Sequence, residues 1–400
     1  MNIDRTSSRP FTILCITGFL AIFSSTISKS PVLPLFATHL GAGPSGVGMV
    51  AAVSAFTGII ASIPAGMLSD RWGRKRMLIM ASVVFGTAPF LYLFVTNIWQ
   101  LAIVRFYHGF ATALFIPVSM ALISDLFHDE RGERLGWFST STLLGRFAAP
   151  IAGGTLLGVF AAHPAFSFRA VYIVCGAAGT AAFVLALRMP ATHEESGAHQ
   201  NWSETWQAFR SVISHRAILI TALVEAAILF AYGTFEAFLP LYAREQGIST
   251  YETGIFLSSQ ILTLALTKPV MGRFSDKHGR RPQIIVGALS GALSIAVFSL
   301  SSSFLPLLLF SVIFGLSLSV VTSATSAYIA DLSKRETHGS AMGILGSVMD
   351  IGHTTGPIAA GIAASAFGYR ISFVSASVVL VLASLLFSVM MFHSPHETSP

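Results

Sequence analysis

The sequence predicts an all-α membrane protein with twelve transmembrane helices, arranged as two six-helix bundles related by an internal repeat. Three observations carry this prediction. First, 53% of the 400 residues are hydrophobic and 10% are charged, with a mean hydropathy of +0.71, whereas soluble globular proteins carry roughly 25% charged residues. Second, apolar stretches of about 20 residues, enough to span a bilayer as helices, recur along the whole chain. Third, the two halves share an ordered set of glycines, prolines and aspartates.

Twelve apolar segments are long enough to cross the membrane as helices. The first is interpreted as a retained span and not as a cleaved signal peptide, because it lacks a convincing cleavage site and eleven further spans follow it. The predicted spans are residues 11–38, 46–68, 77–96, 99–124, 135–160, 169–188, 217–242, 252–274, 283–302, 304–330, 339–366 and 371–392.

The basic residues predict the orientation of these spans. Of the 24 Lys and Arg residues, 17 fall in loops or termini on one side, and only Arg169, Arg244 and Arg370 fall on the other. Because positively charged loops stay cytoplasmic, we expect a multi-pass protein of the bacterial inner membrane with both termini in the cytoplasm. The net charge of +6 is therefore a topology signal, and no nucleic-acid partner is expected.

The two halves of the chain match when the sequence is shifted by 206 positions, or by 207 after one inserted residue. An even number of spans in each half gives both copies the same orientation, which is the parallel repeat of rocking-bundle transporters, with a pocket expected between the bundles. Matching residues include Gly66, Asp70, Gly73 and Arg74 with Gly272, Asp276, Gly279 and Arg280, then Gly145 and Pro150 with Gly352 and Pro357. The expected domains are an N-terminal bundle (1–189), a cytoplasmic linker (190–215) and a C-terminal bundle (216–400).

The turn at residues 66–76 reads Gly-Met-Leu-Ser-Asp-Arg-Trp-Gly-Arg-Lys-Arg and recurs at 272–281. The acid and the bases of this turn have a fixed spacing, so they can form ion pairs across the contact between two helices. The alternative interpretation is a plain positively charged loop without a gating role. The motif closely resembles the signature loop of the major facilitator superfamily, and the resemblance extends over essentially the whole chain. It implies that Asp70 and Arg71 act with Asp125 at the end of span four. The implied cytoplasmic gate comprises Gly66, Asp70, Arg71, Gly73, Arg74, Asp125, Asp276, Arg280 and Asp331.

Span four carries Arg105 inside an apolar helix. An arginine at such depth costs about 2.5–3.5 kcal/mol on insertion scales and usually faces a cavity or a partner. The surrounding pattern is similar to a family motif whose arginine is linked to proton coupling, although His108 stands where the family more often has Gln.

Span five has small residues on one face and a proline that bends it. This pattern resembles the motif of exporters in the same family, proton antiporters above all, and departs from it only at Ala149. The alternative is a kinked, tightly packed helix without directional meaning. The residues of this motif are Gly136, Gly145, Pro150, Gly153 and Gly154.

The second half carries acids inside its spans, whereas the first half carries bases. Glu225 and Glu236 are close to three helical turns apart and share a face with Tyr232. Ionisable residues at such depth are functional candidates, with a structural ion pair as the alternative. We predict Glu236, Asp350, Arg105 and Glu225 as proton-coupling residues, and Lys29, Arg146, Tyr232, His353, Phe115 and Phe235 as substrate-pocket residues. Packing is the alternative for the aromatic members, and Arg146 is expected to be buried.

Together these features predict a secondary active transporter that exports a small amphipathic drug or metabolite by proton antiport and alternating access. The alternative is a proton-coupled symporter that imports a sugar-like or anionic organic solute. A membrane enzyme or receptor is disfavoured, because the sequence has no nucleophile elbow, metal-ligand cluster or phosphate-binding loop. The expected partners are a small-molecule substrate, protons and the lipid bilayer. No cofactor or metal and a monomeric state are expected.

Overall fold

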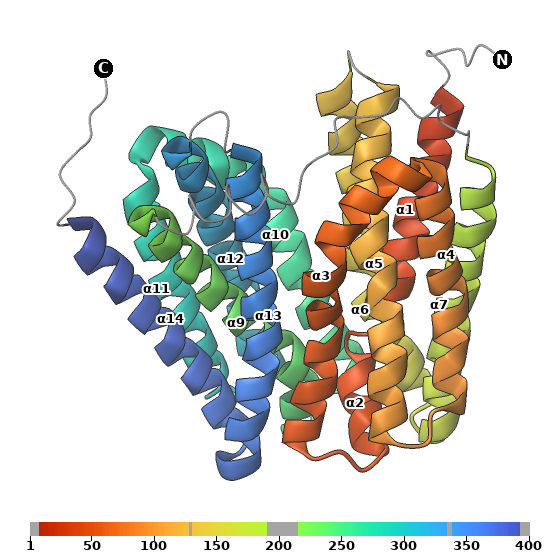
Figure 1. The fold of residues 1–400 in the computed structure, drawn as a ribbon. Coiled ribbons are helices and arrows are strands. Elements are labelled where there is room, and N and C mark those ends of the chain that lie inside the picture. The colour runs from red at the N-terminus through yellow and green to blue at the C-terminus, as the bar shows by residue number, and fades with distance from the viewer. Residues whose placement is uncertain (1–7, 128–129, 190–214, 334–337, 393–400) are drawn as a thin grey trace. The chain divides into compact units, whose positions relative to one another are not determined.

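The computed structural model describes residues 8–127, 130–189, 215–333 and 338–392, and within these it leaves out the side chains of residues 8, 62–71, 338–344 and 392. The described residues form helices joined by short turns, and no strand occurs among them (Figure 1). The helices of the first half are α1 (Ser8–Ile27), α2 (Val32–His39), α3 (Pro44–Trp72), α4 (Arg74–Leu91), η1 (Tyr92–Phe94), α5 (Ile98–Leu126), α6 (Arg131–Val159) and α7 (Pro164–Leu187). Those of the second half are α9 (Arg216–Glu245), α10 (Thr250–His278), α11 (Arg280–Phe298), α12 (Phe304–Leu332), α13 (His338–Phe367) and α14 (Tyr369–Phe392).

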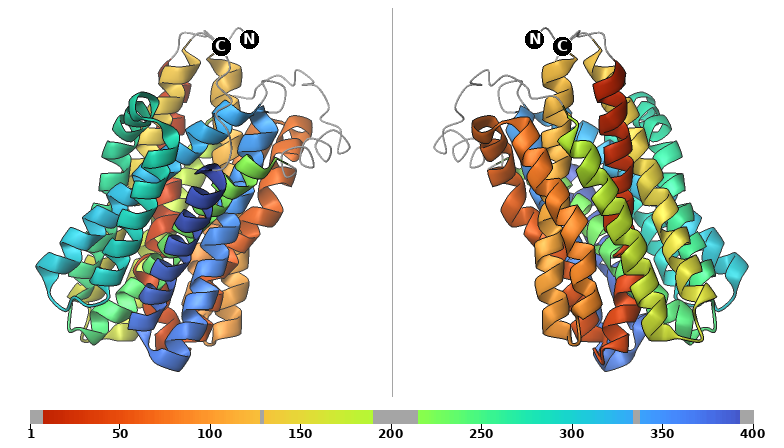
Figure 2. Two further views of the ribbon diagram at one scale, coloured as in Figure 1. Left: turned by 90° about the vertical axis from the view of Figure 1, so that its left-hand side faces the viewer. Right: turned by 90° about the vertical axis from the view of Figure 1, so that its right-hand side faces the viewer.

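These helices confirm the predicted fold class. Eleven spans in the described part of the chain have the length and hydropathy of a membrane crossing. Helix α13 has 30 residues and is the twelfth described helix of 18 residues or more. The long helices run alongside one another within each half, as the side views show (Figure 2).

The first predicted span consists of two helices. Helix α1 ends at Ile27 and α2 begins at Val32, with Pro31 in the connection. Proline has no N–H to donate and disfavours helical geometry in the residue before it, so the ladder of helical hydrogen bonds is interrupted there. Lys29 and Ser30 nevertheless donate their N–H groups to the Thr26 carbonyl, which keeps the connection compact.

Two compact units divide the chain: the first contains Met1–His199 and Ala243–Ser258, and the second contains Gln200–Tyr242 and Ser259–Pro400. In the first unit α1 packs on α6 and α7, while α5 packs on α3 and α4. In the second unit α11 packs on α12 and α14. The cytoplasmic linker at residues 190–215 stays a prediction. The start of α10 belongs to the first unit.

Glycines allow equivalent close helix crossings in both units. A Cβ atom at Gly145 on α6 would lie 2.5 Å from the carbonyl oxygen of Phe19 on α1. Its repeat partner Gly352 on α13 lies in the same way against the carbonyl of Ala226 on α9. The backbones therefore touch at these crossings, which is the close approach that small residues permit in membrane helices.

Two glycines end corresponding helices. Gly73, between α3 and α4, has φ 86°, and Gly279, between α10 and α11, has φ 90°. Side chains rarely tolerate this backbone region, so glycine is required at both positions. The sharp turns place Arg74 and Arg280 as the first residues of α4 and α11.

Candidate functional site

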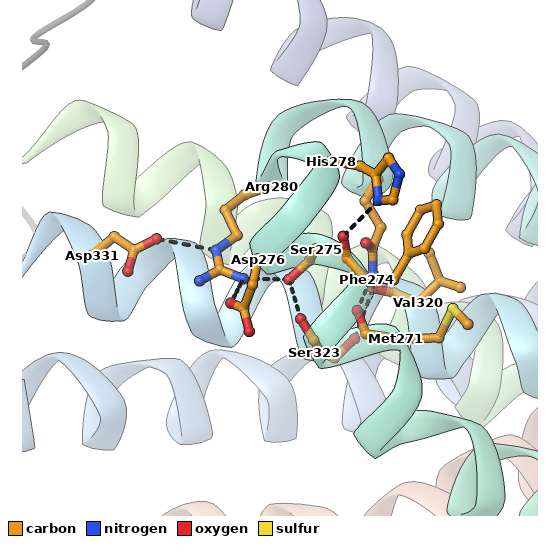
Figure 3. Close-up of polar contacts among 11 residues, drawn as sticks. Met271, Phe274, Ser275, Asp276, His278, Arg280, Val320, Ser323 and Asp331 are labelled. Atoms are coloured by element: carbon orange, nitrogen blue, oxygen red, sulfur yellow. Dashed lines mark hydrogen bonds and ion pairs between the residues drawn. The ribbon is translucent and has the colours of Figure 1, made fainter.

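Arg280 organises a polar cluster at the junction of α10, α11 and α12, which we call the signature cluster: Ser275, Asp276, Arg280 and Asp331. The Nε of Arg280 lies 3.1 Å from Oδ2 of Asp331, and its Nη1 contacts Asp276 and Ser275 (Figure 3). The turn at Gly279 brings Arg280 back beside the last turn of α10. Both carboxylates remain more than half exposed, so each ion pair contributes little to stability and the geometry is easily broken.

The first unit repeats one of these ion pairs. The Nε of Arg74 lies 3.0 Å from Oδ2 of Asp125, which matches the pairing of Arg280 with Asp331 across the same sequence separation. The family resemblance implied a role for Arg71 beside Asp125, whereas the described contact of Asp125 is with Arg74. The side chains of Asp70 and Arg71 lie outside the described residues, and so do the surroundings of Gly66.

Glu236 and His353 meet where α9 crosses α13. The Oε2 of Glu236 lies 3.3 Å from Nε2 of His353, and the Glu236 residue is only 8% exposed. The ring of Tyr232 stands edge-on to His353, with 5.2 Å between ring centroids. Gly233 makes this approach possible, because it lies against the His353 carbonyl and leaves no room for a Cβ. A predicted coupling acid and a predicted pocket residue are therefore direct neighbours.

Glu225 is the most enclosed carboxyl of the second unit. Its residue is 0% exposed, and Thr325 of α12 donates its hydroxyl hydrogen to Oε2. Its other oxygen, Oε1, has no hydrogen-bond partner within the described part of the chain. Asp350, one helical turn before His353 on α13, is half-buried. The structure thus separates a fully buried acid from a second acidic region beside His353.

Arg105 lies inside the first unit and is 2% exposed. It donates to Oγ of Ser54 at 2.8 Å, to Oη of Tyr92 at 3.3 Å and to Oγ of Ser28 at 3.5 Å. Sequence reasoning missed these three partners, since hydroxyl residues are frequent in the chain and nothing in their spacing distinguishes them. His108, on the next turn of α5, lies 3.3 Å from the Tyr92 hydroxyl through Nδ1.

The remaining predicted pocket residues are dispersed. Lys29 is half-buried, and Arg146, which we expected to be buried, is exposed. Phe115 and Phe235 are both 0% exposed. Phe115 packs against Phe85, and Phe235 lies in an aromatic cluster with Phe298, Phe314 and Phe373. Both rings pack in the interiors of the bundles, which is the arrangement that the packing alternative describes.

The small residues of α6 serve two packing surfaces. Gly145 faces α1, while Gly154 lies against the backbone of Thr250 at the start of α10. Thr250 donates its hydroxyl to the Gly154 carbonyl at 3.0 Å, and Ser258 donates to the Phe147 carbonyl at 2.7 Å. Sequence reasoning missed this second surface. Gly254, which lies against the carbonyl of Pro150, matches Gly48 when the sequence is shifted by 206 positions and could have signalled it. Gly136, by contrast, faces open space.

No group of three or more His, Cys, Asp and Glu side chains that could hold a metal ion occurs among residues 8–127, 130–189, 215–333 and 338–392, as far as their side chains are described.

Comparisons with known proteins agree with this arrangement. A sequence model of the Major Facilitator Superfamily matches residues 14–263 and 229–400. The multi-drug resistance efflux pump PmrA of Streptococcus pneumoniae is 26% identical over 372 residues, covering 91% of each chain. The multidrug resistance protein MdtG of Salmonella paratyphi C is 27% identical over 361 residues, covering 88% of each.

Solved structures share the fold at low sequence identity. A bacterial homologue of the human lysosomal transporter Spinster, in an inward-facing and unoccupied conformation, superposes with a TM-score of 0.82 at 17% identity, covering 97% of this chain and 99% of that one. The nucleoside transporter NupG superposes with a TM-score of 0.77 at 14% identity, covering 96% and 100%.

Proposed function

Because this chain belongs to the major facilitator superfamily, whose members are transporters, we propose that it exports a small amphipathic solute in exchange for protons. PmrA is a multi-drug resistance efflux pump and MdtG is a multidrug resistance protein, which supports export of drug-like compounds. The exporter-like motif on α6 supports the same direction of transport. No covalent step on the solute is part of this proposal.

The observation that carries the proton-coupling proposal is the contact between Glu236 and His353. An imidazole and a carboxylate at 3.3 Å form an ion pair only while the histidine is protonated. Loss of that proton removes the attraction and leaves a carboxylate in a nearly dry site, which favours rearrangement of α9 against α13. Asp350, Glu225 and Arg105 complete the proposed coupling residues.

The proposed cycle is alternating access in a monomer whose two termini lie in the cytoplasm. The pairs Arg74–Asp125 and Arg280–Asp331 act as the cytoplasmic gate, together with Gly66, Asp70 and Arg71. Pairs of this exposure are weak, so their opening and closing requires little free energy. Lys29, Arg146, Tyr232 and His353 are the proposed substrate contacts.

Transport by purified protein in liposomes tests the proposal. Vesicles with an imposed pH gradient are loaded with ethidium, a cationic dye, or with carboxyfluorescein, an anionic one, and dye movement is followed by fluorescence. We expect the gradient to drive movement of at least one dye by the wild-type protein. Glu236→Gln and His353→Gln should uncouple that movement from the gradient, because neither variant retains the ion pair.

Glu245→Gln is the matched control, since Glu245 lies at the end of the same helix and is exposed. It should transport as the wild type does. Two results would show that these residues do not couple protons. One is dye movement in the wild type that does not depend on the pH gradient. The other is gradient-driven dye movement that persists in Glu236→Gln, His353→Gln and Asp350→Asn.

The second candidate function is proton-coupled import of an organic anion. It is favoured by Arg105, a buried cation in the first unit whose described partners are all neutral. Accumulation of a labelled solute in intact cells, with and without the protein, separates the two directions. An exporter lowers the intracellular concentration, and an importer raises it when the outside is acidified.

A further inference from the structure

The positive charge of Arg105 has no carboxylate beside it. Its guanidinium donates to the oxygens of Ser54, Tyr92 and Ser28, and among the described residues no acid lies within ion-pair distance of it. Arginine keeps its proton in proteins, so this charge is permanent. Only hydroxyl dipoles compensate it in the described structure.

The surrounding sequence offers no acid either. The segments 8–61, 74–124 and 135–189, which hold α1, α2, α4, α7 and most of α3, α5 and α6, contain neither Asp nor Glu. Removing a charge from water is strongly unfavourable unless an opposite charge and hydrogen bonds replace the hydration. The missing negative charge must therefore come from outside these segments.

The hydrogen bonds around Arg105 show the same imbalance. Nε of Arg105, Nε2 of His108 and Oη of Tyr172 are buried and have no partner within the described chain. The hydroxyl hydrogen of Tyr92 can go to Nδ1 of His108 at 3.3 Å, which leaves the ring hydrogen of His108 on Nε2. All three unpartnered atoms then carry a hydrogen, so the cluster has surplus donors and lacks an acceptor. Buried donors in proteins are nearly always paired.

We propose that these residues form a binding site for a small anion, either a carboxylate group of a solute or a halide ion. Such an ion supplies both the acceptor and the negative charge that the cluster lacks. The rings of Tyr92 and Tyr172 stack with 4.4 Å between their centroids, and both residues are buried, whereas Ser54 is half-buried. The site lies within the first unit and includes Arg105 of the proposed coupling residues, and binding there requires neither a pH gradient nor transport.

Thermal unfolding of the purified full-length protein tests this site. Sodium benzoate and sodium chloride are titrated separately at constant ionic strength, with sodium MES as the balancing salt because its sulfonate is bulky. In the wild type we expect Tm to rise in a saturable way with benzoate, chloride or both. A response to benzoate alone identifies a carboxylate site, and a response to chloride alone identifies a halide site.

Arg105→Gln should abolish the saturable rise, while Arg169→Gln, which removes an exposed arginine of the same unit, should keep it. Ser54→Ala should change the apparent affinity about tenfold, because it removes the hydrogen bond that Arg105 donates to Ser54 and frees that guanidinium hydrogen for the anion. The proposal is overturned if the wild type shows no saturable rise with either anion, or if Arg105→Gln keeps the wild-type response. If Arg105→Gln does not fold, an unchanged affinity in Ser54→Ala has the same consequence.

Discussion

Replacing Gly352 with alanine should destabilise the protein, although alanine is the better helix former. A Cβ at this position would meet the carbonyl oxygen of Ala226 and would lie 2.9 Å from its carbonyl carbon and Cα, all of them backbone atoms that cannot turn aside. Overpacking of this kind costs about 1–3 kcal/mol, and the gain in helix propensity returns up to about 1 kcal/mol. The net loss is on the order of 1–2 kcal/mol, which lowers Tm by roughly 2–8 °C for a bundle of this size.

Gly346→Ala is the matched control on the same helix, since no atom lies within 4 Å of its Cβ position. This variant keeps only the gain in propensity and should leave Tm unchanged or raise it. Unfolding of both variants is followed by circular dichroism in one detergent. If the two substitutions shifted Tm in the same direction, backbone contact would not be what holds α9 against α13. Gly352→Ala should also slow transport, because it displaces the neighbouring His353 from Glu236.

Three further predictions concern other parts of the two bundles. Asp125→Asn and Asp331→Asn should each cost only about 0.2–1 kcal/mol of stability, because their side chains are 47% and 56% exposed. Both should still slow dye transport in vesicles, and a normal transport rate in the double variant would remove these pairs from the gate. Phe115→Ala should lower the free energy of unfolding by about 3–5 kcal/mol. Phe94 is 76% exposed, so Phe94→Ala should change the free energy of unfolding by less than about 0.5 kcal/mol. Similar Tm values for these two variants would contradict the core position of Phe115. Thr325→Val should destabilise the protein by about 1–3 kcal/mol, because it leaves a carboxyl oxygen of Glu225 without a donor. A double-mutant cycle with Glu225→Gln checks this, and additive effects would mean that the two side chains do not interact.

The fold could be predicted from the sequence because each of its signals is local or periodic. Hydropathy gives the spans, and the glycines at 73 and 279 mark turns whose positive φ values the structure contains. The break between α1 and α2 was predictable in principle from Pro31, but the apolar run continues through it and the hydropathy signal does not fall. Length and hydropathy alone therefore merged two helices into one span.

The site was only partly predictable, because side-chain partners depend on how helices are rotated against one another. The shared face of Glu236 and Tyr232 followed from the helical period, but the partner of Glu236 lies on a helix more than 100 residues away. Arg71 and Arg74 are three residues apart in the sequence but lie on different helices, and the turn at Gly73 makes Arg74 the first residue of α4, from which it reaches Asp125. The exposure of Arg146 depends in the same way on the rotation of α6, which the glycine contacts at Gly145 set.

The repeat places different ionisable groups at corresponding positions of the two halves. In the repeat register Gly352 corresponds to Gly145, so His353 corresponds to Arg146, and Glu236 corresponds to Ser30. The same glycine-mediated crossing therefore carries an imidazole and a carboxylate in the second unit, and an arginine and a hydroxyl in the first. Because the crossing itself is kept in both units, the difference lies in the ionisable groups and not in the scaffold. An imidazole is the side chain best suited to gaining and losing a proton in the physiological pH range, whereas a guanidinium stays charged. Proton coupling is thus expected at the crossing of α9 and α13, and a fixed attraction for anions in the first unit.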